Sequence, residues 1–104
     1  MSNSRYDEHA RFLSTLSNTK RFAIIRLLLG KRGLNVTQIV EFTGFDQSTV
    51  SHCLKRLASC QYVFSKPNGK ERIYSLNKDT IVPLLRLIGR HVKKYCPKCS
   101  EVKV

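Results

Sequence analysis

Residues 46–59 carry side chains whose types and spacing suit contact with nucleic acid. In a helix successive residues lie about 100° apart, and this spacing gathers hydroxyls, an imidazole and two cations on one side. The residues of that side are Ser48, Thr49, Ser51, His52, Lys55, Arg56 and Ser59. Hydroxyls and cations bind phosphates or base edges, and the neighbouring Gln47 can reach adenine. An ordinary solvated face usually mixes acids with bases, whereas this one has no acid, so we predict that helix 46–59 contacts DNA.

A basic hairpin is predicted directly after this helix, over residues 62–76. Two β-prone runs are separated by Pro67-Asn68-Gly69, a sequence typical of a tight turn. The cations of the hairpin are Lys66, Lys70 and Arg72. Beside a recognition helix, such cations clamp the phosphate backbone or enter the minor groove.

The cysteines offer a second kind of chemistry. In the motif CPKC, Cys96 and Cys99 have the spacing of a zinc knuckle, which directs two thiolates at one ion. This is half of a structural zinc site, and the other ligands would come from a dimer mate or from His91, Cys53 or Cys60. The same spacing suits a reversible dithiol, and a tail without function is the third alternative. We expect Cys53 and Cys60, seven residues apart, to be small buried hydrophobes near the margin of the core.

Composition limits the class of protein. The chain has 104 residues, a formal net charge of +12 and a pI near 10.0, which indicate one domain with a polyanionic partner. Nucleic acid is the favoured partner, and an anionic membrane surface is the second choice. The alternative is a soluble basic protein without such a partner. No apolar run is long enough to span a membrane, and the start, MSNSRYDEHARF, lacks the apolar core of a secretory signal. We therefore expect a cytoplasmic, nucleoid-associated protein whose thiols stay reduced.

Five helices and one hairpin are expected to position these residues. Apolar spacing predicts helices over residues 6–16, 18–29, 37–43 and 46–59, and a last helix that Asn77 caps. Gly30 and Gly44 would end the second and third helices. The expected inward residues include Leu29 in the second helix, Phe42 in the third, and Val50, Leu54 and Leu57 in the fourth. The order α-α-α-α-β-β-α is mainly α with a small β-hairpin, which is a winged helix-turn-helix.

Two stretches resemble the ArsR-type (arsenic-repressor-like) family of winged helix-turn-helix transcriptional regulators. LSNTKRFAIIRLLL is similar to the family's opening helix, and FDQSTVSHCLKRLASCQYVFSKPNGKERIYSL is similar to its recognition helix and wing. The resemblance covers about residues 10–90 and implies a homodimeric repressor that dimerises through its first and last helices. It would place Gln47, Ser48, Thr49, Ser51 and His52 in the major groove, and Lys70 and Arg72 on the wing. Residues 1–95 would form the DNA-binding and dimerisation domain, and residues 96–104 a cysteine-containing tail.

The sequence departs from the family at several positions. Cys53 stands where the family often has histidine, and Gln61-Tyr62 stands where it has glycine before the wing. The Cys-x-Cys motif of the metal-sensing branch is absent from NVTQIVEFT, and the last helix has only His91 in place of paired ligands. We therefore do not expect the family's metal sites here.

The candidate functions fall into three classes. A sequence-specific regulator of transcription, reading a palindromic double-stranded operator, fits the polar helix face and the apolar stripes of the terminal helices. A general nucleic-acid-binding or architectural protein would use the same scaffold without an effector. An enzyme is not expected, because the chain has no paired carboxylates, phosphate loop or nucleophile–base pair.

Overall fold

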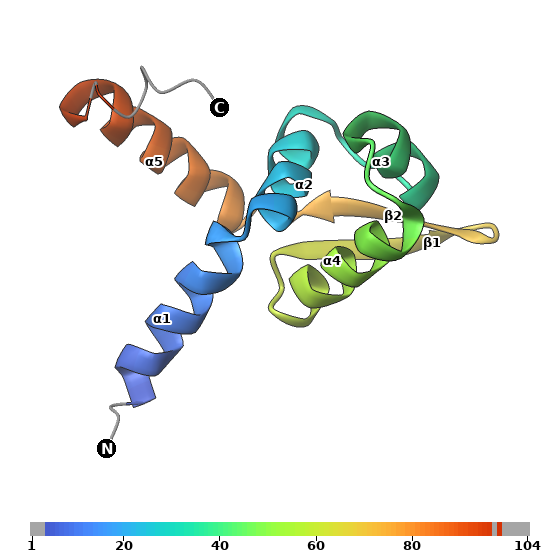
Figure 1. The fold of residues 1–104 in the computed structure, drawn as a ribbon, viewed down its shortest axis with the longest axis horizontal. Coiled ribbons are helices and arrows are strands. Elements are labelled where there is room, and N and C mark those ends of the chain that lie inside the picture. Colours follow the sequence, from blue (N-terminus) through green and yellow to red (C-terminus); the bar gives the residue numbers. More distant parts are fainter. Residues whose placement is uncertain (1–3, 97, 99–104) are drawn as a thin grey trace.

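The computed structural model describes residues 4–96 and residue 98, and it contains five helices and a two-stranded antiparallel sheet (Figure 1). The elements are α1 (Ser4–Ser17), α2 (Thr19–Gly30), α3 (Val36–Thr43), α4 (Gln47–Ser59), β1 (Val63–Asn68), β2 (Glu71–Leu76) and α5 (Ile81–Tyr95). The predicted order is confirmed. A short helix, a turn and a second helix, followed by a hairpin, form a winged helix-turn-helix.

Polar side chains cap the starts of three helices. Asn18 caps α2, and its side-chain oxygen accepts a hydrogen bond of 3.0 Å from the Arg21 amide. Asn35 and Gln38 form a capping box at the start of α3, with reciprocal bonds of 2.8 and 2.9 Å. Asp46 caps α4 through the Thr49 amide at 2.7 Å. These caps satisfy backbone donors that would otherwise lack partners, so they fix where each helix begins.

The helix ends follow the sequence less closely. Gly44 ends α3 as predicted, in a left-handed conformation with φ of 77°. Gly30 does not end α2: it is the last helical residue, and Lys31 follows it in an extended conformation. At the start of α5, Asn77 is not the cap, because Thr80 holds that position. The Asn77 side chain instead accepts hydrogen bonds from the amides of Asp79 and Thr80.

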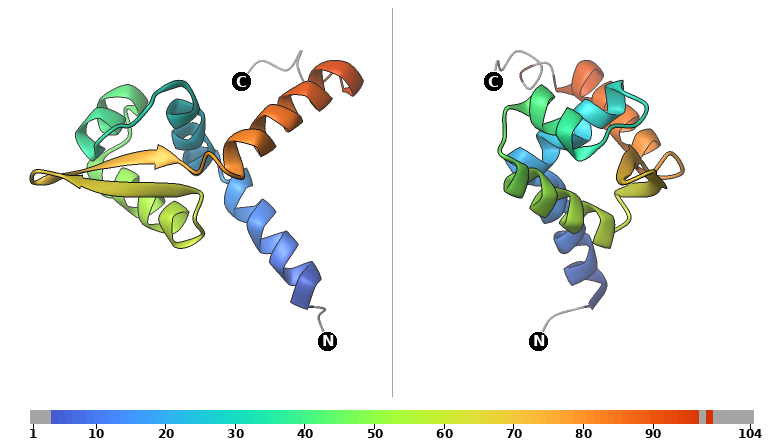
Figure 2. Two further views of the ribbon diagram at one scale, coloured as in Figure 1. Left: turned by 180° about the vertical axis from the view of Figure 1, so that it is seen from behind. Right: turned by 90° about the vertical axis from the view of Figure 1, so that its right-hand side faces the viewer.

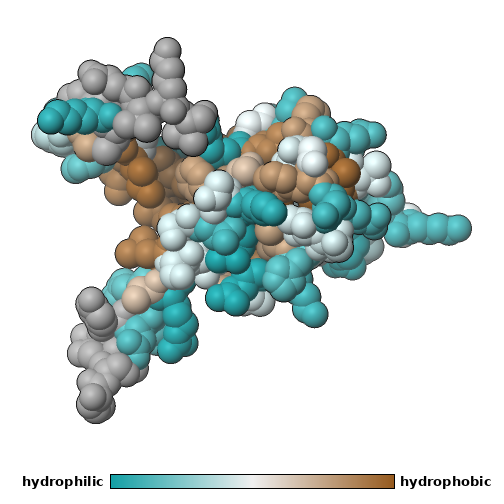
Figure 3. Space-filling view, in the orientation of Figure 1, coloured by the Kyte–Doolittle hydropathy of each residue, from teal (hydrophilic) through white to brown (hydrophobic). Residues whose placement is uncertain are grey.

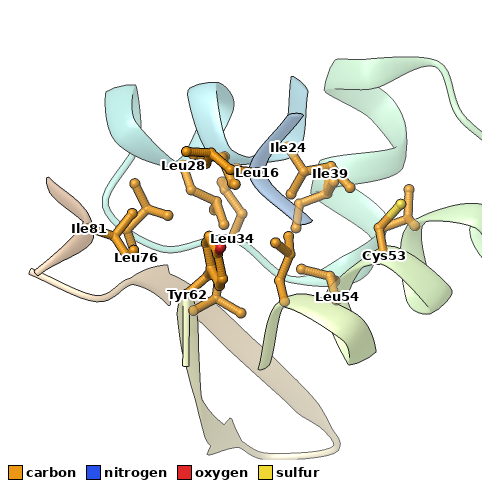
Figure 4. Close-up of a cluster of buried hydrophobic side chains, with 14 residues drawn as sticks. Leu16, Ile24, Leu28, Leu34, Ile39, Cys53, Leu54, Tyr62, Leu76 and Ile81 are labelled. Atoms are coloured by element: carbon orange, nitrogen blue, oxygen red, sulfur yellow. The ribbon is translucent and has the colours of Figure 1, made fainter. Parts of the chain in front are cut away.

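One hydrophobic core joins α2, α3 and α4 to the hairpin (Figure 4). Val50, Leu54 and Leu57 of α4 are at most 1% exposed, as their spacing predicted. Tyr62 is fully buried in front of the wing; its hydroxyl donates to the Phe12 carbonyl, and the two rings stack at 4.9 Å. This contact ties α1 to the base of the wing, and burial raises the pKa of Tyr62 to about 12.

The register of the hairpin corrects the predicted turn. Asn68 pairs with Glu71, so the turn consists of Gly69 and Lys70, and Gly69 has a φ of 67°. Pro67 lies within β1, opposite Arg72. Proline is tolerated there because β1 has a neighbouring strand on one side only. The turn therefore lies nearer the C-terminus than predicted: Gly69 is retained, Lys70 joins it, and Asn68 belongs to β1.

Three residues predicted to be buried are exposed. Phe42 is 55% exposed, because the eight-residue α3 buries Ile39 and presents Phe42 to the Lys31 ammonium, 4.7 Å from the ring centroid. Leu29 is 42% exposed and lines a groove between α2 and α5. Cys60 is exposed because α4 ends at Ser59, so the helical spacing that related it to Cys53 no longer applies.

Helices α1 and α5 project from this body in diverging directions (Figures 1 and 2). Ile81 at the start of α5 is buried, whereas Leu87 and Ile88 farther along are 54% and 41% exposed. Within the described residues, no helix is long and apolar enough to cross a membrane.

Candidate nucleic-acid interface

Helix α4 presents one polar face and buries the other. Seven residues, which we call the α4 polar face, were predicted to contact DNA: Gln47, Ser48, Thr49, Ser51, His52, Lys55 and Arg56. All are exposed except Thr49, which is half-buried. On the opposite side Cys53 is 6% exposed and packs with the α4 leucines in the core. Because the buried side is held rigidly, the polar side is presented in a fixed orientation.

The carboxylate of Asp46 belongs to the cap of α4. It accepts hydrogen bonds from the Thr49 amide and, at 3.1 Å, from the Ser48 hydroxyl. The hydrogen bond from the Thr49 amide holds the pKa of Asp46 below its usual value, with smaller contributions from Ser48 and the charge of Lys20. Among the described residues of α4 and its cap, Asp46 is the only acid beside the α4 polar face. Its carboxylate is occupied by the hydrogen bonds that cap the helix.

The three predicted wing cations are all exposed. Arg72 is oriented by a hydrogen bond of 3.0 Å from its Nε to the Ser65 hydroxyl on the facing strand. Lys70 lies in the turn, and Lys66 lies opposite Ile73 in the register of β1 and β2. The wing therefore carries cations along its length and at its tip.

Two links fix the wing against the helix-turn-helix. Leu34 and Tyr74 exchange backbone hydrogen bonds of 3.1 and 2.8 Å, which add a short bridge to the edge of the sheet. Near the tip, the Asn35 side-chain amide donates to the Glu71 carboxylate at 2.9 Å. Asn35 also caps α3, so a single residue joins the start of that helix to the wing.

Sequence reasoning missed a contribution from α2. A groove beside the α4 polar face is lined by residues of α4 and by Asn18, Lys20 and Arg21. Arg21 is held by a hydrogen bond of 3.0 Å from its Nε to the Thr15 carbonyl, whereas Lys20 is exposed near the Phe45 ring. The signal available in the sequence was the pair Lys20-Arg21, which follows the cap Asn18 after a single residue and therefore lies in the first turn of α2.

The cysteines do not form a shared site among the described residues. Cys53 faces the core, and burial raises the pKa of its thiol, so it stays protonated at neutral pH. Cys96 is half-buried at the end of α5, and Cys99 lies outside the described residues. Across residues 4–96 and 98, no three His, Cys, Asp or Glu side chains are grouped closely enough to hold a metal ion.

A recognition helix with an acid-free polar face, held beside a cationic hairpin, defines a winged helix-turn-helix of the DNA-binding class. Residues 18–65 match the family described as "Bacterial regulatory protein, arsR family". The chain is 32% identical over 74 residues to the arsenical resistance operon repressor of Staphylococcus xylosus, which covers 71% of this chain and 70% of that protein. It is 29% identical over 83 residues to the transcriptional repressor PagR of Bacillus anthracis, covering 80% of this chain and 83% of PagR. The chain belongs to the ArsR family.

Solved structures agree with this fold. The Mycobacterium tuberculosis protein Rv0081 superposes with a TM-score of 0.84 at 25% identity, covering 95% of this chain and 99% of that one. A Mycobacterium bovis domain, described as a homodimeric winged helix-turn-helix DNA-binding domain of a possible ArsR-family regulator, gives a TM-score of 0.77 at 24% identity. That comparison covers 91% of this chain and 90% of the domain. The architecture predicted from sequence is confirmed.

Proposed function

We propose that this protein is a homodimeric repressor of transcription that binds a specific double-stranded DNA operator. The observation that carries the proposal is the α4 polar face, which is exposed, free of acids and adjacent to a cationic wing. Helix α4 would enter the major groove, and the wing would hold the flanking backbone. Relatives named as repressors support repression rather than activation of transcription. The site of action would be the bacterial cytoplasm, at the chromosome.

Each residue of the interface has a chemical role in this proposal. Ser51 and His52, at the centre of the polar face, would contact base edges, and Gln47 at the start of α4 would contact adenine. Lys55 and Arg56 farther along would contact phosphates or guanine. Ser48 and Thr49, close to the helix start, would contact phosphates. Lys66, Lys70 and Arg72 on the wing would provide the largest part of the salt-dependent affinity.

Dimerisation would use α1, α2 and α5. Apolar surface gathers in the angle between α1 and α5 (Figure 3). Leu13 on α1 is 58% exposed, and Phe22 lines both the groove beside it and the groove that continues to Ile88 on α5. A continuous apolar strip of this kind is unfavourable in water, and a second copy related by a twofold axis would cover it. Two α4 helices related by that axis would then read a palindrome with half-sites about one helical turn apart.

The test is selection of an operator from random duplexes, followed by titration against the selected and scrambled sequences at several salt concentrations. We expect the operator to bind at least about a thousandfold more tightly than the scrambled duplex. The logarithm of the affinity should fall linearly with the logarithm of salt, because phosphate contacts release counterions. Equal affinities for both duplexes would contradict the proposal and support an architectural protein.

Zinc remains a separate proposal that rests on Cys96 and Cys99. Cysteine pairs at this spacing are suitable zinc ligands, and a second pair from a dimer mate would complete a tetrahedral site. The described part of the chain supplies no third ligand close by. Metal analysis of untagged protein should find one zinc for each dimer, lost in the Cys96→Ser variant. Protein that contains no zinc and whose DNA affinity is unchanged by oxidation would leave the motif without either role.

A further inference from the structure

A second cationic groove lies at the base of α5, away from the α4 polar face. Its cations come from three segments: Lys31 and Arg32 follow α2, Lys78 follows β2, and Arg86 lies on α5. None of its lining residues belongs to α4 or to the predicted wing contacts. Seen from behind, the end of β2 and the start of α5 meet at this side of the molecule (Figure 2). The groove is therefore distinct from the candidate DNA interface.

The positive charge of this groove is not compensated within the described part of the chain. Arg32, Lys78 and Arg86 are exposed and make no hydrogen bond or ion pair through their side chains with the described residues. Lys31 contacts only the face of the Phe42 ring. No acid is among the lining residues, although the protein has seven acids. Arg32, Lys78 and Arg86 line the same groove and repel one another, and a multiply charged anion would relieve that repulsion.

The groove also has an apolar side. Leu29, which is 42% exposed, lines both this groove and the groove between α2 and α5, and the half-buried Val82 also lines this groove. Such a surface binds a ring or another flat apolar group, while the surrounding cations bind phosphates through charge-assisted hydrogen bonds. Inorganic phosphate alone would leave the apolar side uncovered. A ligand that joins an apolar ring to several phosphates would use both features.

We propose that this groove binds a small organic polyanion of the nucleoside polyphosphate class. The phosphates would lie between Arg32, Lys78 and Arg86, and the ring would lie against Leu29 and Val82. Because the cations come from three segments, a bound ligand would hold the α2–α3 turn, the end of the wing and the base of α5 together. The proposal does not depend on DNA binding, since it concerns different residues.

The test is calorimetric titration of the full chain with ATP and with pyrophosphate, at a salt concentration of about 0.15 M that screens diffuse surface charge. The wild-type protein is expected to bind ATP more tightly than pyrophosphate, because only ATP covers the apolar side. Lys78→Ser combined with Arg86→Ser should weaken ATP binding by about tenfold or more, because two charge-assisted contacts are lost. Both residues are exposed, so thermal unfolding without ligand should be nearly unchanged.

The matched control removes the same charge from the wing. Lys66→Ser combined with Lys70→Ser should change ATP affinity by less than about twofold while weakening DNA binding. Equal losses of ATP affinity in both double variants would show diffuse attraction and overturn the proposal. It would also be overturned if wild-type protein bound no ATP, or if the groove variant lost DNA affinity while its ATP affinity stayed unchanged.

Discussion

Helices α4 and α5 are both amphipathic, but the described residues cover the apolar side of α4 and leave part of the apolar side of α5 exposed. The apolar side of α4 is covered by α2, α3 and the hairpin, and Val50 and Leu57 have no exposed surface. Helix α5 buries Ile81 at its start and leaves Leu87 and Ile88 exposed. The difference indicates two purposes: α4 is fixed within the protomer so that its polar side can be read, whereas α5 keeps an apolar side for a second copy. Substitutions of apolar residues should therefore lower the stability of the protomer when they lie in α4 and weaken dimer association when they lie in α5.

The largest effect is expected for Leu54→Ala in α4. Leu54 is 1% exposed in the core, so truncation should lower the free energy of unfolding by roughly 2–5 kcal/mol. Urea denaturation measures this change. Leu87→Ala on α5 is the matched control, and its effect on a protein diluted to monomers should be within about 0.5 kcal/mol. Equal destabilisation by both substitutions would remove the distinction between the two helices.

The converse experiment places a charge on α5. Ile88→Glu should weaken dimer association by about a hundredfold, because it would place an unpaired carboxylate in an apolar interface. Sedimentation equilibrium measures the association, and circular dichroism verifies that the helices remain. A variant that dimerises as well as wild-type protein would move the interface away from α5.

A smaller effect is expected at the start of α4. Asp46→Ala removes the side chain that caps the helix and should lower the free energy of unfolding, whereas Asp46→Asn retains an acceptor and should lower it less. The lowered pKa of Asp46 sets the pH dependence. Its charged form is favoured in the folded state, so the ionic part of this stability is present above the unfolded pKa. That part is lost as the pH falls through the folded pKa.

Unfolding measured at neutral and acidic pH tests this dependence. The difference in the free energy of unfolding between wild-type protein and Asp46→Asn should become smaller in acid. A gap that does not change with pH would show that the charge of the cap contributes nothing.

The smallest effect is expected where α4 meets the wing. Gln61 has a φ of 64°, the left-handed conformation that glycine adopts without strain. Gln61→Gly should raise the free energy of unfolding by up to about 1 kcal/mol. Gln61→Ala keeps the β-carbon and should give no gain. Equal effects of the two substitutions would rule out backbone strain as the cause.

Local rules predicted α4 well because all its determinants lie within a short stretch. Asp46 supplies the cap, and Val50, Leu54 and Leu57 have the spacing of one helical face. Periodicity states which residues share a face, but it does not state what covers that face. Phe42 and Leu29 were wrongly predicted to be buried for this reason, since no element among the described residues covers the outer side of α3 or the α2–α5 groove.

Features that depend on tertiary contacts could not be predicted from the sequence. The turn residues of the hairpin depend on the register between β1 and β2, which Pro67 at the edge of the sheet does not fix. The proximity of Lys20 to α4 and the bond between Asn35 and Glu71 join segments far apart in the chain. The DNA contacts of the polar face and wing remain predictions, because they depend on a partner.

The most direct test of the account is the specificity of a protein that carries Ser51→Ala together with His52→Ala. Both side chains are exposed on the α4 polar face, so the fold and the dimer should be retained. We expect the ratio of operator affinity to scrambled-duplex affinity to fall to about one, while the salt-dependent affinity for any duplex persists. A variant that keeps the wild-type ratio would show that another surface reads the DNA and would contradict the central claim.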